Sequence, residues 1–213
     1  MRAGKYTLWG RPGWGSAIVE AQLDWYGLPF DFEAVDDLFK SPQARARLEK
    51  VNPLAQVPTL VLPDGSVMSE SAAITLLLAD ITGQHSLVPE IGAPERPKFL
   101  RWLVYLVANI YPTFTYADDP SRFVSVSAAR DPFRAATDAY AQRLWHQVER
   151  QAGSPWFLGE RFSALDIYID VMTRWRPKRG WFESETPKLF AIARKADQVP
   201  ELQAVWRRNY PTG

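Results

Sequence analysis

The chain has 213 residues, of which 46% are hydrophobic, and it carries 25 Lys and Arg against 24 Asp and Glu. This length allows one large domain or two small ones, and the hydrophobic fraction speaks against a disordered chain. The nearly balanced charge gives no electrostatic reason to expect a nucleic acid or an anionic membrane as a partner.

The chain contains no cysteine and only two histidines, His85 and His146. The absence of cysteine rules out disulfides, thiolate metal sites and a cysteine nucleophile, and two histidines make zinc or Ser-His-Asp chemistry a poor candidate. We therefore expect no metal, and any thiol used in a reaction must arrive with a ligand. No apolar run approaches the roughly 20 residues that span a bilayer, and no secretory signal is visible, so a cytoplasmic location is expected.

The first 82 residues predict an α/β domain with the element order βαβαββα. Short apolar and β-branched segments predict strands, and capped apolar segments predict helices. The expected strands are 6–9, 30–35, 59–62 and 66–68, and the expected helices are 17–27, 41–50 and 72–81. Asp64-Gly65 between the last two strands is a hairpin signal. This order is typical of one mixed sheet with helices packed on it.

Strand signals end after residue 82, and the segment that follows is rich in proline and glycine. We expect a linker at 83–92 and an all-helical domain at 93–213. Apolar residues recur at helical spacing in several segments of this half. The expected helices are 99–110, 140–148, 165–172, 187–196 and 200–208.

Pro58 stands directly before the predicted strand 59–62, where it withholds an N–H from the sheet. If the bond between Val57 and Pro58 is cis, the N–H and C=O of Val57 turn outward and can pair with an extended peptide. On this residue alone, an ordinary proline at a strand entry is the better explanation.

Glu70 and Ser71 stand at the start of the predicted helix 72–81. Free N–H groups and the helix dipole favour a carboxylate ligand at such a position. The Ser71 hydroxyl and N–H would hold that carboxylate while Glu70 receives an ammonium group. The alternative is a capping pair, in which Ser69 and Ser71 only end the strand and begin the helix.

Two segments of the chain resemble cytosolic glutathione transferases. Residues 52–60 (NPLAQVPTL), the Asp64-Gly65 turn and residues 69–74 (SESAAI) resemble the glutathione-binding half of that family. Residues 156–167 (WFLGERFSALDI) are similar to its capping-box segment, in which Ser163 and Asp166 cap a buried helix. The resemblance covers nearly the whole chain, and it implies a thioredoxin-like N-terminal domain followed by an all-α domain.

The resemblance also implies a glutathione site. Val57 would pair its backbone with the cysteinyl part of glutathione, and Pro58 would be the family's cis-proline. Glu70 and Ser71 would hold the γ-glutamyl end, and Lys40 is a candidate partner for the glycyl carboxylate. The candidate glutathione-binding residues are therefore Gln56, Val57, Pro58, Glu70, Ser71 and Lys40.

The residue that would activate the thiol departs from the family pattern. Family members use a Tyr, Ser or Cys near the end of the first strand or the start of the first helix, but Trp9 stands where several classes carry tyrosine. Residues 11–16 resemble the bacterial beta-class loop with its cysteine replaced by Gly15. Ser16 is the next hydroxyl, and its Oγ–H would stabilise a thiolate at the helix start. A plain N-cap explains Ser16 equally well.

Trp14 and Tyr111 are the candidates for a second-substrate site. Trp14 would shield the thiolate or simply pack, and Tyr111 would donate a hydrogen bond to a substrate held by helical aromatic residues. The expected walls of that site are Tyr105, Phe114, Tyr116 and Trp175. An aromatic stripe at helical spacing is more often part of a core.

By resemblance, the expected activity is transfer of the glutathione thiolate, as a co-substrate, to small, largely apolar electrophiles, a detoxification reaction. Two alternatives stay open: a glutathione-dependent reductase, dehalogenase or isomerase, and a non-catalytic glutathione- or ligand-binding protein. The family also implies a homodimer in which the first domain of one subunit faces the helices of the other.

Overall fold

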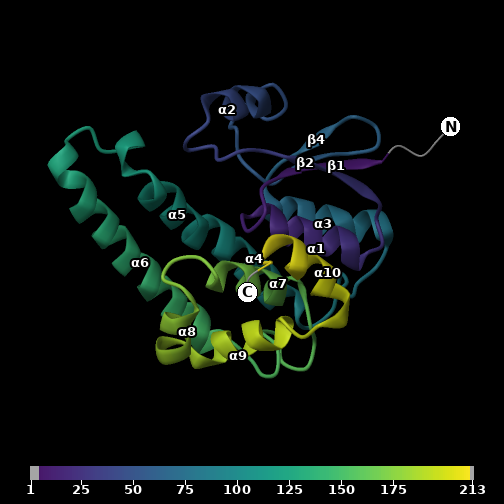
Figure 1. Cartoon of the computed structure of the whole chain (residues 1–213). Helices are drawn as coiled ribbons and strands as arrows, with labels where there is room; N and C mark the ends of the chain where they lie inside the picture. The colour runs from purple at the N-terminus through teal and green to yellow at the C-terminus, as the bar shows by residue number, and fades with distance from the viewer. Residues whose placement is uncertain (1–4, 212–213) are drawn as a thin grey trace. The chain divides into compact units, whose positions relative to one another are not determined.

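The computed structural model of the chain describes residues 5–211, which form two compact units (Figure 1). The first unit contains residues up to Val88 and those from Ala196 onward, and the second unit is Pro89–Lys195. Residues 1–4, considered above for a secretory signal, and residues 212–213 lie outside the described residues. The expected domains 1–82 and 93–213 stay a prediction, and the spatial grouping places the C-terminal segment with the first unit.

The first unit contains a four-stranded mixed sheet in the order β2-β1-β3-β4. Its strands are β1 (Tyr6–Gly10), β2 (Phe30–Ala34), β3 (Thr59–Val61) and β4 (Val67–Met68). β1 pairs in parallel with β2, whereas β3 runs antiparallel to both β1 and β4. A parallel strand–helix–strand unit followed by a hairpin produces this order, which confirms the predicted α/β pattern.

Helices cover both sides of this sheet. They are α1 (Ser16–Trp25), α2 (Pro42–Glu49), α3 (Ser71–Thr82) and, near the C-terminus, α10 (Gln203–Asn209). In Figure 1, α1 and α3 lie side by side on one side of the sheet, and α2 lies on the other. α10 packs against α1, so α1 is buried along most of its length.

The core of the first unit lies between the sheet and the α1–α3 pair. Leu8 and Leu60 are paired across β1 and β3 and are fully buried, as are Ile18 on α1 and Ile74 on α3. In β1 every second residue points into this core, which is the period of a strand with one covered face. Each such side chain contributes roughly 1.5–3 kcal/mol to the stability of the unit.

The second unit is helical, as predicted, apart from an isolated β-bridge between Trp156 and Gly159. Its α-helices are α4 (Arg96–Tyr105), α5 (Tyr111–Asp118), α6 (Arg130–Gln151), α7 (Ala164–Thr173), α8 (Arg179–Glu185) and α9 (Pro187–Ala196, whose last residue falls in the first unit). Short 3₁₀ turns lie at Pro120–Arg122 and Ser127–Ala129, and a further one at Pro200–Leu202 precedes α10. α5 and α6 pack against each other (Figure 1).

A π-helical turn, Leu106–Ile110, joins α4 to α5. Pro112 follows this turn near the start of α5 and has no N–H to return to the carbonyl of Ala108. A local widening of the helix accommodates such a missing bond without ending the helix. The turn is therefore a bulge within a continuous helical path from α4 to α5.

Ser163 and Asp166 form the predicted capping box at the start of α7. The Asp166 carboxylate accepts hydrogen bonds from the N–H of Ser163 at 2.8 Å and from the N–H of Phe157, also at 2.8 Å. Every residue of α7 is buried. Burial raises the pKa of Asp166 to about 7, although the hydrogen bonds from Phe157 and Ser163 act in the opposite direction.

Within residues 5–211, none of the helices has the length and apolar character needed to cross a membrane. No cluster of three or more His, Asp or Glu side chains in the same range is placed to hold a metal ion.

Candidate functional site

Val57 lies two residues before the start of β3, and its peptide bond to Pro58 is cis, as predicted. Pro58 is buried, Val57 is half-buried and Gln56 is exposed. Within residues 5–211, neither the N–H nor the C=O of Val57 makes a hydrogen bond. This peptide group is therefore open to pair with the backbone of a bound peptide.

Asn52 holds the segment that presents Val57. Its side-chain amide donates hydrogen bonds to Thr59 Oγ1 at 2.9 Å and to the Gln56 carbonyl at 3.2 Å. Its amide oxygen accepts from the N–H of Leu54 at 3.1 Å, and Thr59 Oγ1 donates to the Gln56 carbonyl at 2.8 Å. Both Asn52 and Thr59 are buried, so this network fixes the backbone on either side of Val57.

Glu70 and Ser71 form the start of α3, as predicted. Glu70 occupies the N-cap position with φ 63° and ψ 98°, a region that a non-glycine residue enters at a cost of about 1–3 kcal/mol. No side chain caps this helix start, so the capping-pair alternative for Ser69 and Ser71 is not what the structure shows. Among the described residues, no cation lies within ion-pair distance of the exposed Glu70 carboxylate.

The first amides of α3 point out of the helix without acceptors. In the described part of the chain, the N–H groups of Ser71, Ala72 and Ala73 have no hydrogen-bond partner, whereas Ile74 bonds back to the Glu70 carbonyl at 3.0 Å. Free N–H groups and the positive end of the helix dipole favour a carboxylate here. The helix start is thus a site for an anionic ligand group, with the Glu70 carboxylate beside it.

A buried hydrogen-bond chain ties this helix start to α1. Thr75 Oγ1 donates to the Ser71 carbonyl at 2.9 Å, and Gln22 Nε2 donates to Thr75 Oγ1 at 3.0 Å. Sequence reasoning missed both residues, because 53 positions separate Gln22 from Thr75. A polar residue within an otherwise apolar helix was the only signal in the sequence.

Ser16 closes the loop between β1 and α1 instead of capping the helix. Its hydroxyl accepts from the N–H of Arg11 and donates to the Arg11 carbonyl, each at 3.0 Å. The N-cap position belongs to Gly15, and no side chain caps α1, so the N-cap interpretation of Ser16 is wrong. The Ser16 side chain is fully buried, and a Cβ on Gly10 would lie 2.5 Å from its Cβ.

The role of Ser16 toward a thiolate stays a prediction, and its single hydroxyl proton points to Arg11 in this structure. The backbone offers a second source of donors. Within residues 5–211, the N–H groups of Gly15 and Ser16 have no acceptor, whereas the next amide, of Ala17, bonds to the Trp14 carbonyl at 3.0 Å. These two free amides lie at the positive end of the α1 dipole.

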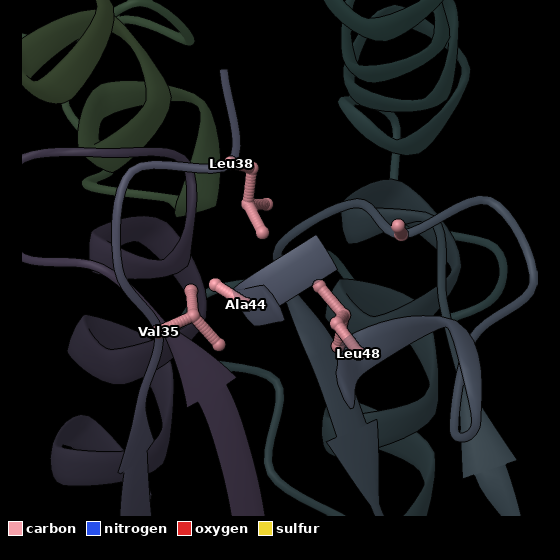
Figure 2. Close-up of a cluster of buried hydrophobic side chains, with 5 residues drawn as sticks. Val35, Leu38, Ala44 and Leu48 are labelled. Atoms are coloured by element: carbon pink, nitrogen blue, oxygen red, sulfur yellow. The ribbon is translucent and has the colours of Figure 1, made fainter. Parts of the chain in front are cut away.

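Trp14 packs on a small group of buried side chains beneath α2, which we call the α2 cluster. Figure 2 shows this cluster, with Ala44 and Leu48 on α2 and Val35 directly after β2. Its members are Val35, Leu38, Ala44, Leu48 and Ala55. Trp14 and Val57 both pack against it. The structure thus brings together the loop at the start of α1 and the segment predicted to pair with the cysteinyl part of glutathione.

Lys40 lies in the exposed segment before α2. Its side chain is 83% exposed, and its Nζ lies 3.7 Å from Asp37 Oδ2. This arrangement neither orients nor buries the ammonium group, so the proposed contact with the glycyl carboxylate of glutathione stays a prediction.

Tyr111 lies in the second unit and joins an aromatic group there. Its ring meets Trp175 edge-on at 5.5 Å between centroids, and Phe114 meets the same ring at 5.1 Å. Two other expected wall residues have different neighbours, since Tyr105 contacts Trp102 and Tyr116 contacts Phe123. Tyr111, Phe114 and Trp175 are therefore the part of the expected second-substrate wall that the structure gathers.

The architecture and site define a class: a thioredoxin-like unit with an open peptide group before β3 and an uncapped α3, joined to an all-helical unit. Residues 16–81 match the family model described as the glutathione S-transferase N-terminal domain. The chain is 37% identical to the uncharacterized GST-like protein YncG of Escherichia coli K12 over 203 residues. The aligned region covers 95% of this chain and 97% of that protein. The chain therefore belongs to the glutathione S-transferase family.

Solved structures agree with this assignment. A glutathione transferase from Methylococcus capsulatus is 30% identical, with a TM-score of 0.77 over 95% of this chain and 97% of the other. A sphingomonad glutathione S-transferase complexed with glutathione is 27% identical, with a TM-score of 0.75 over 94% of this chain and 97% of the other.

Proposed function

We propose that the protein binds glutathione in its first unit and transfers the glutathione thiolate to small, largely apolar electrophiles. The observation that carries this proposal is the open Val57 peptide group, which Asn52 and Thr59 hold in place. A bound cysteinyl residue would pair with both the N–H and the C=O of Val57. Support for glutathione as the ligand also comes from family membership and from the glutathione complex of the sphingomonad relative.

The γ-glutamyl end of glutathione would lie at the start of α3. Its carboxylate would accept from the free amides there and from the Ser71 hydroxyl, while its ammonium group would pair with Glu70. The strained backbone at Glu70 supports this role, because residues with strain of this kind cluster at active sites and ligand-binding positions.

The thiolate would be held near the start of α1, where the free amides of Gly15 and Ser16 and the dipole of the helix stabilise negative charge. Such donors lower the pKa of a thiol, which is about 8.5 for an unperturbed cysteine. The thiolate then attacks an electrophilic carbon, a C–S bond forms, and the leaving group departs with the bonding electron pair. Proximity and a stabilised thiolate are sufficient for this reaction.

Conjugation of glutathione to an activated aryl halide tests the proposal. The matched control is cysteinylglycine, a thiol that lacks the γ-glutamyl residue and so cannot use the start of α3. We expect catalysed conjugation with glutathione and only the uncatalysed rate with cysteinylglycine. Equal acceleration of both thiols, or of neither, would contradict the proposal.

A non-catalytic glutathione-binding protein is the second candidate function. It is favoured by Gly15 at the position of the beta-class cysteine and by the Ser16 proton that is engaged with Arg11. Retention on immobilised glutathione without conjugation of any tested electrophile would support this candidate.

We also propose that the protein is a homodimer. Several large hydrophobic side chains are exposed, including Ile81 at 47% and Val104 at 54%. A shallow groove of about 430 Å³ lies between α5 and α6. We propose that these side chains and this groove belong to the surface that contacts a second copy of the chain, since contiguous exposed apolar patches mark contact sites. A mass by light scattering near the 24.2 kDa of one chain would contradict this proposal.

A further inference from the structure

The C-terminal helix α10 makes a direct hydrogen bond to the loop that precedes α1. The side-chain oxygen of Asn209 accepts from the N–H of Gly13 at 3.0 Å, across 196 positions of the sequence. The Asn209 amide group donates to Glu20 Oε2 at 2.7 Å and to the Val205 carbonyl at 3.1 Å. Asn209 is buried, so both ends of its side chain are committed to protein partners.

Glu20 orients this amide from the middle of α1. Its carboxylate is almost fully buried, with 4% of the side chain exposed, and it accepts from Arg208 Nε at 2.6 Å as well as from Asn209. Arg208 also donates to Asp24 at 2.5 Å. Partial burial would lower the pKa of Arg208, but its hydrogen bonds to Asp24 and Glu20 outweigh that effect and raise it. The guanidinium therefore stays charged beside the Glu20 carboxylate.

The Glu20 carboxylate decides which way the Asn209 side chain points. A buried carboxylate only accepts hydrogen bonds, so the NH₂ group of Asn209 must face Glu20 and its oxygen must face Gly13. Gly13 itself has φ 78°, a conformation that a side chain would strain. The loop is thus fixed at its tip by Asn209 and at its base by the contacts between Ser16 and Arg11.

The loop fixed in this way leads directly into the free amides of Gly15 and Ser16. We propose that Asn209 is a positioning residue for these amides: through Gly13 it sets the loop that holds the glutathione thiolate, with Glu20 orienting Asn209. This inference rests on the proposed function. It adds a residue of the last helix to the machinery that lowers the pKa of the bound thiol.

The test is the pKa of glutathione bound to the full chain, followed by the ultraviolet absorbance of the thiolate, which requires no turnover. Asn209→Ala removes the contact with Gly13. Gln203→Ala is the matched control, because Gln203 lies on the same helix and donates only to the nearby carbonyls of Asp197 and Val199. Arg11, the charged side chain of the loop, is unchanged in both variants.

We expect Asn209→Ala to raise the pKa of the bound thiol by about one unit, which lowers the thiolate fraction about tenfold at a pH well below that pKa. Gln203→Ala should leave the pKa at the wild-type value even where it lowers the melting temperature. An unchanged pKa in Asn209→Ala, or equal shifts in both variants, would overturn the inference. The absence of bound thiolate in the wild-type protein would overturn the proposed thiol activation as well, so the two failures are distinguishable.

A second variant covers the case in which Asn209→Ala does not fold. Glu20→Gln keeps the shape of the side chain but removes the charge that dictates the orientation of Asn209. We expect a shift of the thiol pKa in the same direction and of smaller size. A wild-type pKa in a folded Glu20→Gln protein would overturn the assigned role of Glu20, and with it the orientation on which the positioning by Asn209 depends.

Discussion

The side-chain amide of Asn52 donates a hydrogen bond to the hydroxyl of Thr59 at 2.9 Å, across the segment that presents Val57. The two residues act as a brace for a peptide group that has no partner of its own in the described chain. A backbone that must pair with a ligand on both its N–H and its C=O has to be rigid before the ligand arrives, because ordering it during binding lowers the affinity.

Asn52→Ala should therefore weaken glutathione binding. The substitution removes the donor to the Thr59 hydroxyl and one of the two donors to the Gln56 carbonyl. A net loss of about 1–1.5 kcal/mol corresponds to roughly five- to tenfold in the dissociation constant. Calorimetry measures this directly. Leu54→Ala is the control, because that side chain is 59% exposed and its N–H still reaches Asn52. Equal affinities for the Asn52 variant and the wild type would refute the brace.

Glu70→Ala should cost roughly 1.5–3 kcal/mol of glutathione binding, the value of a hydrogen bond to a charged group. Folding should be nearly unaffected, since the Glu70 side chain makes no capping bond in the structure. Calorimetry and thermal melting of the same variant separate the two effects. An unchanged dissociation constant would mean that Glu70 is only the residue before a helix.

Glu70→Gly distinguishes backbone strain from the function of the side chain. Glycine adopts φ 63° without a steric penalty, so the variant should melt at a temperature no lower than that of Glu70→Ala. It should nevertheless bind glutathione as weakly as Glu70→Ala. A lower melting temperature for the glycine variant would show that the backbone at this position carries no strain.

Ser16→Ala should lower turnover at about pH 6.5 more than at about pH 9, where the thiol ionises without help. The substitution also removes two hydrogen bonds to the buried base of the loop, so a loss of stability of about 1–3 kcal/mol is expected. The pH–rate profile and thermal melting are measured together. A loss of stability with an unmoved profile would leave the backbone amides of Gly15 and Ser16 as the thiolate donors.

Asp166 gives the second unit a pH dependence of known sign. Its pKa is raised by burial from 3.8 to about 7, so the folded state binds a proton more tightly than the unfolded state does. The contribution of this group to stability is thus full below about pH 4 and is lost as the pH rises through about 7. Asp166→Asn cannot titrate, and its unfolding free energy should change less over that range than that of the wild type. Denaturant titrations at several pH values give the unfolding free energy of both proteins as a function of pH. If the two dependences are parallel, the Asp166 carboxyl keeps its ordinary pKa.

The sequence was sufficient to predict the elements that hold the site but not the contacts that fix it. Val57, Glu70 and Ser71 lie in local patterns, a proline before a strand and a polar pair before an apolar helix, and these patterns depend on nearby residues only. The orientation of Asn209 depends on Glu20 and on Gly13, which are distant in sequence, so no local pattern indicates it. For Ser16, the sequence predicted the position at the start of the helix but not the direction of the hydroxyl. The hydroxyl donates to the Arg11 carbonyl, and Gly10, which has no side chain, allows β1 to lie close to Ser16.

The π-helical turn Leu106–Ile110 accommodates one more residue than an α-helical path of the same rise, and each residue of an α-helix accounts for a rotation of about 100°. The side chains of α5 therefore point in a different direction from the one they would have if α4 continued as a regular α-helix. Deleting one residue from this turn would restore a regular helix, and it would swing Tyr111 and Phe114 away from Trp175. Such a deletion would leave the aromatic residues of this unit in place but would change the direction in which they point. The number of residues in the turn therefore determines which aromatic rings contact each other.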